Sequence, residues 1–412
     1  MVAEDEVKAE ENNDENLPPA YFLSLTVENI RCFGPRQILD LSKGNDQPAQ
    51  WTVILGNSGT GKTTLLQCLA MLEPVSSVLL DEPEVMMPRA SKFLGDYNWE
   101  SSVYRGENEL FISGAILSGH TLTGSEQGEV IKEFYFRGTY GNRNSNLKEA
   151  AKVGGLVCYS YGALRRMGIG SLADKARYDY HGISLFDDNA SLLNAEQWLL
   201  KLDYAASKPS DIRDVCKEKL ELLREVFIGF LPGVTDIDFR ISGEDRTSPQ
   251  AQFKTNYGWV SMNDLSLGYK TMIAWMADLS YRLIKRYPES PDPLAEPAIV
   301  LIDEIDLHLP PQWQRDMIRF LSERFVNTQF IVTAHNPLIV QWTNASRNKE
   351  NKVNFVVLEQ EKDYVLVKND EKAIRDWRIN QIVASELFGL VTHSYELEKI
   401  LSKRRNLFLK DG

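Results

Sequence analysis

The sequence predicts an α/β fold in which helices cover a sheet of mostly parallel strands. WTVILG (51–56) is an apolar run that ends in glycine, and a helical pattern, TTLLQCLAML (63–72), follows it after a short Gly-rich turn. EPAIVLIDE (296–304) and TQFIVTAH (328–335) contain short, fully apolar runs with a helical pattern between them. Such runs are typical of strands that are buried on both faces of a parallel sheet.

A second, antiparallel β lobe is expected beside this core. YFLSLTVENIRCF has the pattern of an alternating strand, with Phe22, Leu25 or Val27, and Ile30 as candidates for burial. Two further extended stretches, separated by polar loops, suggest antiparallel strands: ELFISGAILSG (109–119) and VIKEFYFRGTYG (130–141). GGLVCYSYG (154–162) is expected to be another strand.

Two amphipathic helices are expected next, at about 192–206 and 211–230, within a compact helical lobe at about 163–232. Ser210 or Asp211 is expected to cap the second helix, which Pro232-Gly233 would end. The apolar face of that helix is expected to consist of Ile212, Val215, Leu222, Leu223, Val226 and Phe227.

The pattern after this lobe predicts two more strands, DIDFRIS (236–242) and FKTNYGWVSM (253–262), and then a third helix with Ser266 as its N-cap. VNFVVLEQEKDYVLVK (353–368) resembles a hairpin, and YELEKILSKRRNLFL (395–409) resembles an amphipathic helix with a basic stripe. The chain has no internal repeat and no long heptad array, so an extended coiled-coil arm is not expected.

Three parts are therefore expected along the chain: a disordered acidic tail (1–20), an α/β domain (21–345) and a C-terminal hairpin and helical extension (346–412). The apolar positions of the last helix suit either docking of a partner or packing against its own domain. These positions are Leu397, Ile400, Leu401 and Phe408.

Charge and composition limit the classes of function. The 412-residue chain has a net charge of −12, and residues 1–19 supply half of it with seven acidic residues and one lysine. An acidic body argues against a protein that coats nucleic acid indiscriminately, although it is compatible with a local basic patch. No apolar run approaches the roughly 18 residues of a membrane span, and the acidic start differs from a targeting peptide, so we expect a cytoplasmic protein without a membrane partner. Cys32, Cys68, Cys158 and Cys216 lack metal-ligand spacing, so reduced and mostly buried thiols are expected.

GNSGTGKT matches the phosphate-loop pattern G-x-x-x-x-G-K-[ST] between an expected strand and an expected helix, which is the context the pattern requires. Its glycines let backbone N–H groups curl around phosphates at a helix N-terminus, which favours anions. We expect Lys62 to bridge the β- and γ-phosphates of a nucleotide and the Thr63 hydroxyl to ligate Mg²⁺. The expected nucleotide-binding residues here are Gly56, Asn57, Ser58, Gly59, Thr60, Gly61, Lys62, Thr63 and Thr64.

LIDEID places two carboxylates at the end of an apolar strand, the edge at which open α/β sheets bind ligands. We expect Asp303 to belong to the Mg²⁺ shell and Glu304 to orient or deprotonate an attacking water. His335, directly after the next apolar strand, is expected to reach the γ-phosphate. Asp306 and His308 leave a metal-nuclease site open as an alternative.

DLSLGYKT (264–271) offers a second anion site. Ser266 would cap a helix N-terminus, and Gly268 would allow a phosphate to approach closely. The phosphate loop already surrounds its own nucleotide, so the second site makes sense if it completes the nucleotide site of another subunit.

The order of these motifs resembles that of the ABC-class ATPases from Tyr21 to about Pro337. In that class the serine-glycine signature contacts the γ-phosphate bound to the opposite subunit. VENIRCFG, DEIDLHLPPQWQ and TAHNPLIV are similar to the branch of SMC, RecF and OLD proteins. YGALRR, LNAEQWLLKLDYAA and SELFGL resemble stand-alone bacterial anti-phage ATPases, a group that includes PtuA of Septu and AriA of PARIS.

The resemblance implies an ABC-type ATPase head with a mixed, largely parallel sheet core, an antiparallel β lobe and a compact helical lobe. It implies ATP and Mg²⁺ as cofactors, Glu304, His335 and Lys62 as catalytic residues, and Arg31 near the phosphates. It also implies self-association, as a homodimer or a higher even-numbered oligomer, and a separate effector nuclease. Nucleic acid is a further candidate partner.

Some features depart from the family pattern or fit several interpretations. Ser58 stands where many relatives carry Asn, and no Gln is placed as in the usual Mg²⁺-sensing loop; both departures bear on hydrolysis more than on binding. Arg165 and Arg166 fit contact with phosphate or nucleic acid, or a solvated pair. Three other functions stay open: a repair-type DNA clamp, a transporter ATPase and a nucleotide-gated scaffold that barely hydrolyses ATP.

Overall fold

A computed structural model describes the protein at residues 18–77, 85–88, 107, 109–119, 121–124, 128–139, 142–145, 151–153, 155–168, 182–241, 249–336, 339 and 353–369. The predicted acidic tail lies outside these residues except for 18–20, where the first strand already begins at Ala20. The predicted C-terminal helix (395–409) lies outside them entirely.

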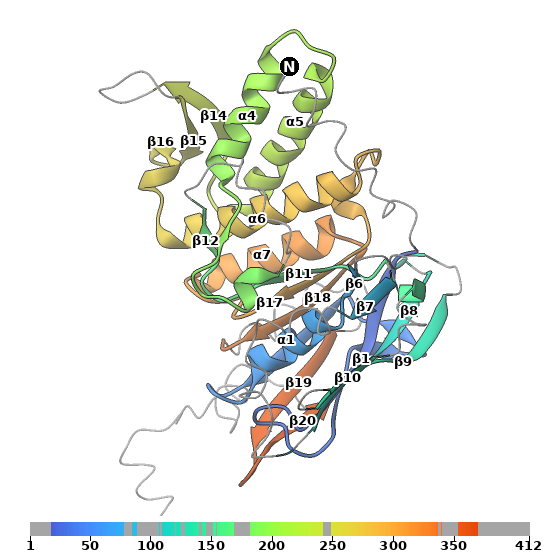
Figure 1. Ribbon diagram of the computed structural model, residues 1–412. Helices are drawn as coiled ribbons and strands as arrows, with labels where there is room; N and C mark the ends of the chain where they lie inside the picture. Colours follow the sequence, from blue (N-terminus) through green and yellow to red (C-terminus); the bar gives the residue numbers. More distant parts are fainter. Residues whose placement is uncertain are drawn as a thin grey trace, which may run out of the picture.

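A six-stranded sheet forms the centre of the molecule, in the order β11-β17-β18-β5-β19-β20 (Figure 1). Neighbouring strands run parallel except for β20, which is antiparallel to β19. The strands are β5 (Trp51–Gly56), β11 (Cys158–Tyr161), β17 (Ala298–Ile302), β18 (Thr328–Ala334), β19 (Val353–Gln360) and β20 (Val365–Asn369). Because β5, β17 and β18 are buried along their whole length, the sheet is covered on both faces there. The hairpin that the sequence assigned to a C-terminal extension joins this sheet through β19.

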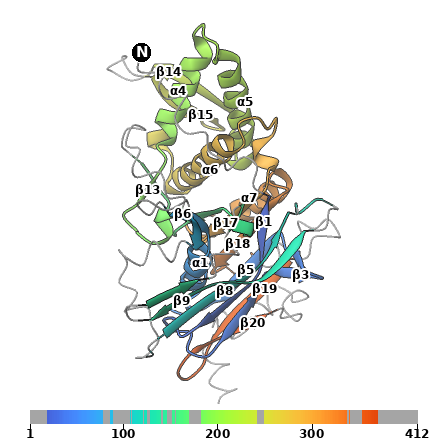
Figure 2. The same ribbon diagram turned by 45° about the vertical axis from the view of Figure 1, so that its right-hand side comes forward.

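Helix α1 (Lys62–Met71) lies between the central sheet and a five-stranded antiparallel sheet, β10-β9-β8-β1-β2 (Figure 2). Leu65 and Leu69 of the helix share one buried cluster with Phe22 of β1 and Leu301 of β17. The antiparallel strands are β1 (Ala20–Glu28), β2 (Gln37–Asp40), β8 (Glu109–Ser118), β9 (Glu129–Thr139) and β10 (Asn142–Ser145). This packing fixes the start of α1, and so the phosphate loop, against the end of β5.

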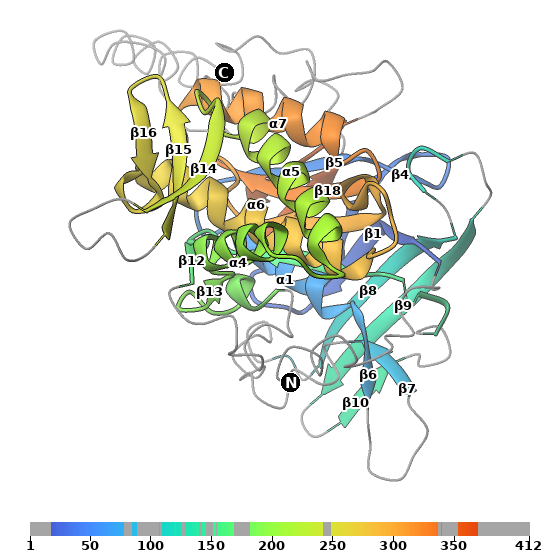
Figure 3. The same ribbon diagram turned by 90° about the horizontal axis from the view of Figure 1, so that it is seen from above.

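The opposite face of the central sheet is covered by α6 (Leu267–Arg286) and α7 (Pro311–Arg324), with α4 (Ala195–Ser207) and α5 (Arg213–Phe230) lying over them (Figure 3). A small antiparallel sheet stands beside α4 and α6; its strands are β14 (Asp236–Ile241), β15 (Pro249–Thr255) and β16 (Gly258–Ser261). Trp275 of α6 packs edge-on against Phe230 of α5, with ring centroids 5.3 Å apart. These helices, the small sheet and one face of the central sheet therefore form a second continuous core.

Short elements complete the described structure. The short strands are β3 (Ser42–Gly44), β4 (Gln47–Pro48), β6 (Pro74–Ser77), β7 (Val85–Pro88), β12 (Arg166–Met167) and β13 (Ser191–Leu192). The 3₁₀ helices are η3 (Ala151–Val153), η5 (Ile183–Leu185), η6 (Met262–Asp264) and η7 (Pro293–Ala295).

The predicted cap of α5 was wrong. Its N-cap position is Ile212, without a capping side-chain hydrogen bond, instead of Ser210 or Asp211. The apolar face was only partly right, since Ile212 and Val215 are 51% and 46% exposed. Periodicity identifies the apolar face of a helix but not where its packing partner ends, and the first turns of α5 project beyond α6 and α7 (Figure 1). The residues of that face that are buried are Leu223, Val226 and Phe227.

The first strand also differs from its predicted pattern. Tyr21, Phe22 and Leu23 are consecutive and all buried, so β1 is covered on both faces instead of alternating. The α/β fold class itself is confirmed, with a largely parallel central sheet, an antiparallel lobe and a helical lobe. In the part of the chain that the structure describes, no helix is long and apolar enough to span a bilayer.

Candidate functional site

The carboxyl ends of the parallel strands bring most of the predicted site residues together. Gly56 ends β5, Asp303 follows β17 and His335 follows β18. Because these strands are parallel neighbours, the phosphate loop, the Asp-Glu pair and the histidine meet at one edge of the sheet.

The phosphate loop depends on left-handed backbone at two glycines, Gly59 (φ +82°) and Gly61 (φ +85°). Gly61 is the N-cap of α1. A Cβ atom built on Gly61 would lie 2.4 Å from the Cys32 sulfur and 2.8 Å from the Phe33 ring. The segment that follows β1 therefore presses directly against the loop, and only glycine fits at Gly61.

Lys62 is buried beneath the loop. Its Nζ donates hydrogen bonds to the carbonyl oxygens of Gly56 (2.8 Å) and Asn57 (3.0 Å). Burial lowers the pKa of this ammonium group, while the carboxylates of Asp303 and Glu304 oppose that shift. The cation thus sits inside the curl of the loop, where a phosphate would need it.

Thr63 and Asp303 are in direct contact across the two motifs. The Thr63 hydroxyl donates to Asp303 Oδ2 at 2.7 Å, and the Thr333 hydroxyl donates to Oδ1 at 2.6 Å. A hydroxyl and a carboxylate at this spacing form the oxygen donor set that Mg²⁺ prefers when it also binds nucleotide phosphates. The residues present therefore fit a Mg²⁺ ion.

Glu304 and His335 form a pair beside this site. His335 Nε2 lies 3.2 Å from Glu304 Oε1, and the side chains are 39% and 30% exposed, so both reach solvent. Glu304 has left-handed backbone (φ +48°), which is uncommon for a residue other than glycine. Its N–H donates to the Thr333 hydroxyl at 2.7 Å. The turn after β17 is thus held in a specific shape that directs this carboxylate toward the histidine.

Asp306 anchors the histidine from behind. Its buried carboxylate accepts the backbone N–H of His335 (3.1 Å) and that of Asn336 (2.6 Å). Gln314 of α7 bonds both to the Asp306 carbonyl (3.1 Å) and to the Asn336 side chain (2.8 Å). Asp306 therefore binds the protein's own backbone, and His308 is an exposed residue with left-handed backbone (φ +63°).

Arg31 faces the first helix. Its guanidinium donates to the Thr64 hydroxyl (3.2 Å) and to Gln67 Oε1 (2.7 Å), both on α1. Gln67 in turn donates to the carbonyl oxygen of Leu185 at 2.8 Å. The structure therefore places Arg31 against the start of α1, one residue beyond the phosphate loop.

Arg165 and Arg166 separate in the structure. Arg166 is exposed, but Arg165 is only 3% exposed and donates to the carbonyl oxygens of Asp303 (2.7 Å) and Glu304 (3.0 Å). Burial lowers the pKa of Arg165 to about 10, so its guanidinium is still charged at neutral pH. Neither sequence interpretation of the pair describes Arg165, because its contacts join residues far apart in the chain.

The signature residues lie at the N-terminus of α6, on the other face of the central sheet from α1. Ser266 is the N-cap as predicted, but its side chain makes no capping hydrogen bond. Ser266 and Leu267 are exposed, Leu267 by 60%. Gly268 is buried, and a Cβ atom there would lie 3.0 Å from the His308 carbonyl oxygen. The signature thus presents at the surface a serine whose hydroxyl does not cap its own helix, and Gly268 packs on the turn that follows Glu304.

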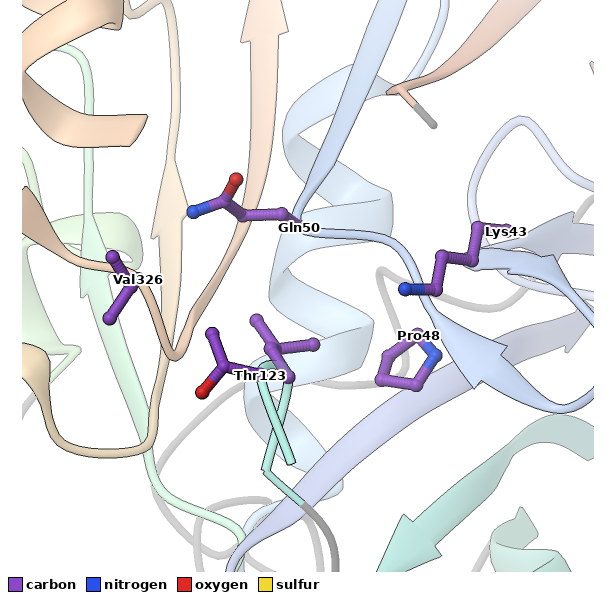
Figure 4. Close-up of a pocket in the computed structure, with 6 residues that line it drawn as sticks. Lys43, Pro48, Gln50, Thr123 and Val326 are labelled. Carbon is purple, nitrogen blue, oxygen red and sulfur yellow. The ribbon is translucent and has the colours of Figure 1, made fainter. Parts of the chain in front are cut away.

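A small cavity lies at the opposite edge of the sheet (Figure 4). Gln50, directly before β5, and Val326, shortly before β18, line it with Lys43, Pro48 and Thr123. These positions are at the amino ends of the strands, away from the phosphate loop. The cavity therefore does not belong to the candidate site.

Sequence reasoning missed the residues that orient the site. Thr333, Gln314 and Asn336 contact Asp303, Asp306 or each other through side chains. Thr333 and Asn336 lie within two residues of His335 in the sequence, and this closeness to a predicted site residue could have identified them as candidates. Gln314 carried no such signal, because its partners are brought to it only by the packing of α7.

Two family models match the chain. Residues 161–341 match a model described as "AAA domain, putative AbiEii toxin, Type IV TA system", and residues 24–72 match one described as "AAA domain". The first segment includes the signature, the Asp-Glu pair and His335, and the second includes the phosphate loop.

Individual relatives come from two named systems. The "Retron Ec83 probable ATPase" of Escherichia coli is 32% identical over 199 residues, 48% of this chain and 34% of the relative. "Septu protein PtuA" of Bacillus mycoides (strain KBAB4) is 22% identical over 397 residues, 95% of this chain and 49% of the relative. The chain therefore matches half or less of the length of these relatives.

A solved structure of an SMC head bound to the C-winged helix domain of ScpA aligns with 86% of this chain and 99% of that chain, at 14% identity and a TM-score of 0.47. The chain is thus similar in sequence to a probable ATPase of a retron system, to the Septu protein PtuA and to AAA-domain models that contain the motifs at this edge of the central sheet.

Proposed function

We propose that this chain binds ATP with Mg²⁺ and hydrolyses it. The observation that carries the proposal is the contact between the Thr63 hydroxyl and the Asp303 carboxylate, 2.7 Å, at the same edge of the sheet as the Glu304–His335 pair. A phosphate loop and an acidic strand end are each ambiguous alone. Their union in one site, with a carboxylate and an imidazole beside it, supports phosphoryl transfer to water.

The loop would hold the triphosphate. Its backbone N–H groups, from Gly56 to Thr63, lie at the N-terminus of α1, where the helix dipole adds to their attraction for anions. Lys62 would exchange its bonds to the Gly56 and Asn57 carbonyl oxygens for bonds to phosphate oxygens. Thr64, whose hydroxyl contacts Arg31, would fix that arginine near the phosphates.

Thr63 and Asp303 would hold the Mg²⁺ ion. When bound, the ion offsets the negative charge of the phosphate oxygens. The Thr333 hydroxyl, which donates to the other oxygen of Asp303, keeps the carboxylate in the orientation that presents Oδ2 to Thr63.

Glu304 would orient the attacking water and accept its proton. Its carboxylate is partly exposed and lies 3.2 Å from His335 Nε2, so a water bound between this pair and the γ-phosphate would contact both side chains. His335 would hold the γ-phosphate and restrict the rotation of Glu304. The backbone anchor at Asp306 supports this role, because it fixes the residue that carries the imidazole.

We further propose that ATP joins two copies of this chain. The exposed Ser266 hydroxyl at the start of α6 is free of a capping bond, and Leu267 beside it is an exposed apolar side chain. A helix N-terminus of this kind suits the γ-phosphate of a nucleotide held by another subunit. A homodimer or a higher even-numbered oligomer would satisfy both halves of the site.

The biological role that we propose is anti-phage defence in the bacterial cytoplasm, with the nucleotide state controlling a separate effector nuclease. The similarity to retron and Septu ATPases supports this role, and the alignments cover 34% and 49% of those relatives. The separate effector nuclease is part of this proposal, and a nucleic acid that the chain binds directly is a further proposed partner.

The test combines turnover with molecular mass. Phosphate release and mass by light scattering would be measured with and without ATP and Mg²⁺ for the wild type, Lys62→Ala and Glu304→Gln, with the exposed Glu323→Gln of α7 as the matched control. We expect the control to behave as wild type, Lys62→Ala to lose ATP binding, and Glu304→Gln to bind ATP, stop turning over and accumulate as a dimer. Equal turnover of wild type and Glu304→Gln would remove Glu304 from catalysis.

The defence role needs a separate test in cells. The native locus with wild type or Lys62→Ala would be challenged with a panel of phages, and the efficiency of plating would be compared. Protection that is lost with Lys62→Ala and that requires a neighbouring nuclease gene would support the role. Hydrolysis that DNA stimulates, together with protection that is independent of any partner gene, would favour an ATPase acting directly on DNA.

A further inference from the structure

We infer that Arg165 is a positioning residue for hydrolysis: it clamps the two consecutive carbonyl groups of Asp303 and Glu304 and so sets the direction of the Glu304 side chain. The inference rests on the proposed ATPase function and deepens it. Arg165 comes from the segment after β11, far in sequence from the phosphate loop and from the Asp-Glu strand.

The clamp acts where β17 leaves the sheet. The N–H of Asp303 still donates to the backbone carbonyl oxygen of Tyr161 (2.8 Å), and the N–H of Glu304 donates to the Thr333 hydroxyl (2.7 Å). Their carbonyl oxygens accept from Arg165, at 2.7 Å and 3.0 Å. Both sides of the turn are therefore fixed, the amide side by the sheet and the carbonyl side by one guanidinium.

The guanidinium suits this task. Its planar fork carries parallel donors that can bond two acceptors at once, whereas a lysine ammonium is a compact point donor. Arg165 is 3% exposed, and its Nε has no hydrogen-bond partner among the described residues, so NH1 and NH2 account for its described contacts. Burying a charge costs free energy unless hydrogen bonds and opposite charges offset it. The two carbonyl groups supply the hydrogen bonds, and the carboxylates of Asp303, Asp306 and Glu304 favour the charged guanidinium.

The segment that carries Arg165 is itself held rigidly. A Cβ atom on Gly162 would lie 2.0 Å from the Ser184 carbonyl oxygen, and the Gly162 N–H donates to the Ser184 hydroxyl at 3.3 Å. Arg165 has left-handed backbone (φ +37°), as does Glu304 (φ +48°). One hydrogen bond, from the Arg165 guanidinium to the Glu304 carbonyl oxygen, thus joins two non-glycine residues in this conformation, and each conformation needs its surroundings to persist.

Arg165 touches neither Lys62 nor Thr63 through any described hydrogen bond, so its loss should spare nucleotide binding. It should instead release the Asp303–Glu304 turn and let the Glu304 carboxylate move away from His335. A displacement of about 1 Å of a group that orients the reacting water can cost about 100-fold in rate.

The experiment compares Arg165→Met, Arg165→Lys and Arg165→Ala with Arg166→Met, the exposed neighbour, as the matched control. We expect Arg165→Met to lower kcat about 10- to 100-fold while the Kd for ATP changes less than about 3-fold. Arg165→Lys should retain an intermediate rate, since it supplies a donor for one carbonyl group. Added guanidinium ion should raise the rate of Arg165→Ala, and Arg166→Met should match wild type.

Hydrogen exchange provides a readout that does not depend on turnover. Peptides covering residues 302–308 should exchange faster in Arg165→Met than in wild type, and peptides covering α1 should not. Faster exchange here would support the clamp even if wild type failed to hydrolyse ATP, and that failure would contradict the proposed function alone. Unchanged exchange at 302–308 would overturn the inference, as would wild-type kcat in Arg165→Met. Equal losses of kcat, ATP affinity and melting temperature without guanidinium rescue would also overturn it, because they would indicate a purely structural role.

Discussion

Asp306 should contribute strongly both to stability and to the position of the histidine. Its carboxylate accepts the N–H of His335 (3.1 Å) and of Asn336 (2.6 Å) from a position that is 9% exposed. A hydrogen bond to a charged group is worth about 1.5–3 kcal/mol, and the partial exposure of both donor residues favours the lower end. Asp306→Ala should therefore cost about 3 kcal/mol in the free energy of unfolding, or a fall in Tm of about 3–5 °C for a domain of this size.

Asp306→Asn separates the two bonds. The amide keeps one acceptor oxygen but turns an NH₂ group toward one of the two backbone donors, so we expect about half of the loss, about 1.5 kcal/mol. Turnover should fall in both variants while ATP binding persists, because the backbone of His335 loses its anchor and Lys62 is unaffected. Thermal unfolding and phosphate release measure the two effects, with the exposed Asp188→Asn as the control. A Tm of Asp306→Ala that stays within about 2 °C of wild type would refute this reasoning.

Three other substitutions test separate parts of the structure. Lys62→Ala should abolish ATP binding in a direct titration. Because burial lowers the pKa of Lys62 and only its protonated form attracts phosphate, the affinity of the wild type for ATP should fall with rising pH, and this fall should begin at a lower pH than that at which an ordinary lysine titrates. An affinity for ATP that stays constant up to the titration range of an ordinary lysine would contradict this. Ser266→Arg should bind ATP as tightly as wild type but stay monomeric with ATP, and normal ATP-dependent association would disprove the proposed role of the signature. Arg282→Met should lower the free energy of unfolding by about 3–5 kcal/mol, because it leaves the buried Asp278 carboxylate, 2.7 Å from Arg282 Nε, without its counter-ion. A denaturant midpoint equal to that of wild type would show instead that the hydrogen bond from the Tyr161 hydroxyl, 3.0 Å from Asp278, is enough to stabilise the buried carboxylate.

The sequence alone was sufficient for the motifs whose chemistry is local. The phosphate loop needs a strand, left-handed glycines and a helix start in sequence order, and all of these are adjacent in the chain. The same holds for the strands β17 and β18, since an unbroken apolar run predicts burial on both faces whatever lies above and below it. The parallel arrangement then places Asp303 and His335 at the edge occupied by the loop.

Hydrophobic patterns predicted burial less well where burial depends on how far a neighbouring helix or sheet extends. The periodicity of α5 predicted one apolar face along its whole length, yet Ile212 and Val215 are exposed because the helix extends past its partners. The alternation of β1 failed for the reverse reason, since the antiparallel sheet is covered on both faces at Tyr21, Phe22 and Leu23.

The sequence by itself therefore determined the fold class, the phosphate loop and the edge of the sheet at which the candidate site forms. Only the tertiary structure decided which side chains hold that site in shape. In the sequence, Arg165 fitted contact with phosphate or nucleic acid as well as a solvated pair with Arg166. The chain instead folds it against the carbonyl groups of Asp303 and Glu304, 138 and 139 residues away in sequence. Hydrogen bonds of this kind depend on distances of a few ångströms between segments that sequence patterns cannot align, because periodicity reports the burial of a residue and not the identity of its partner.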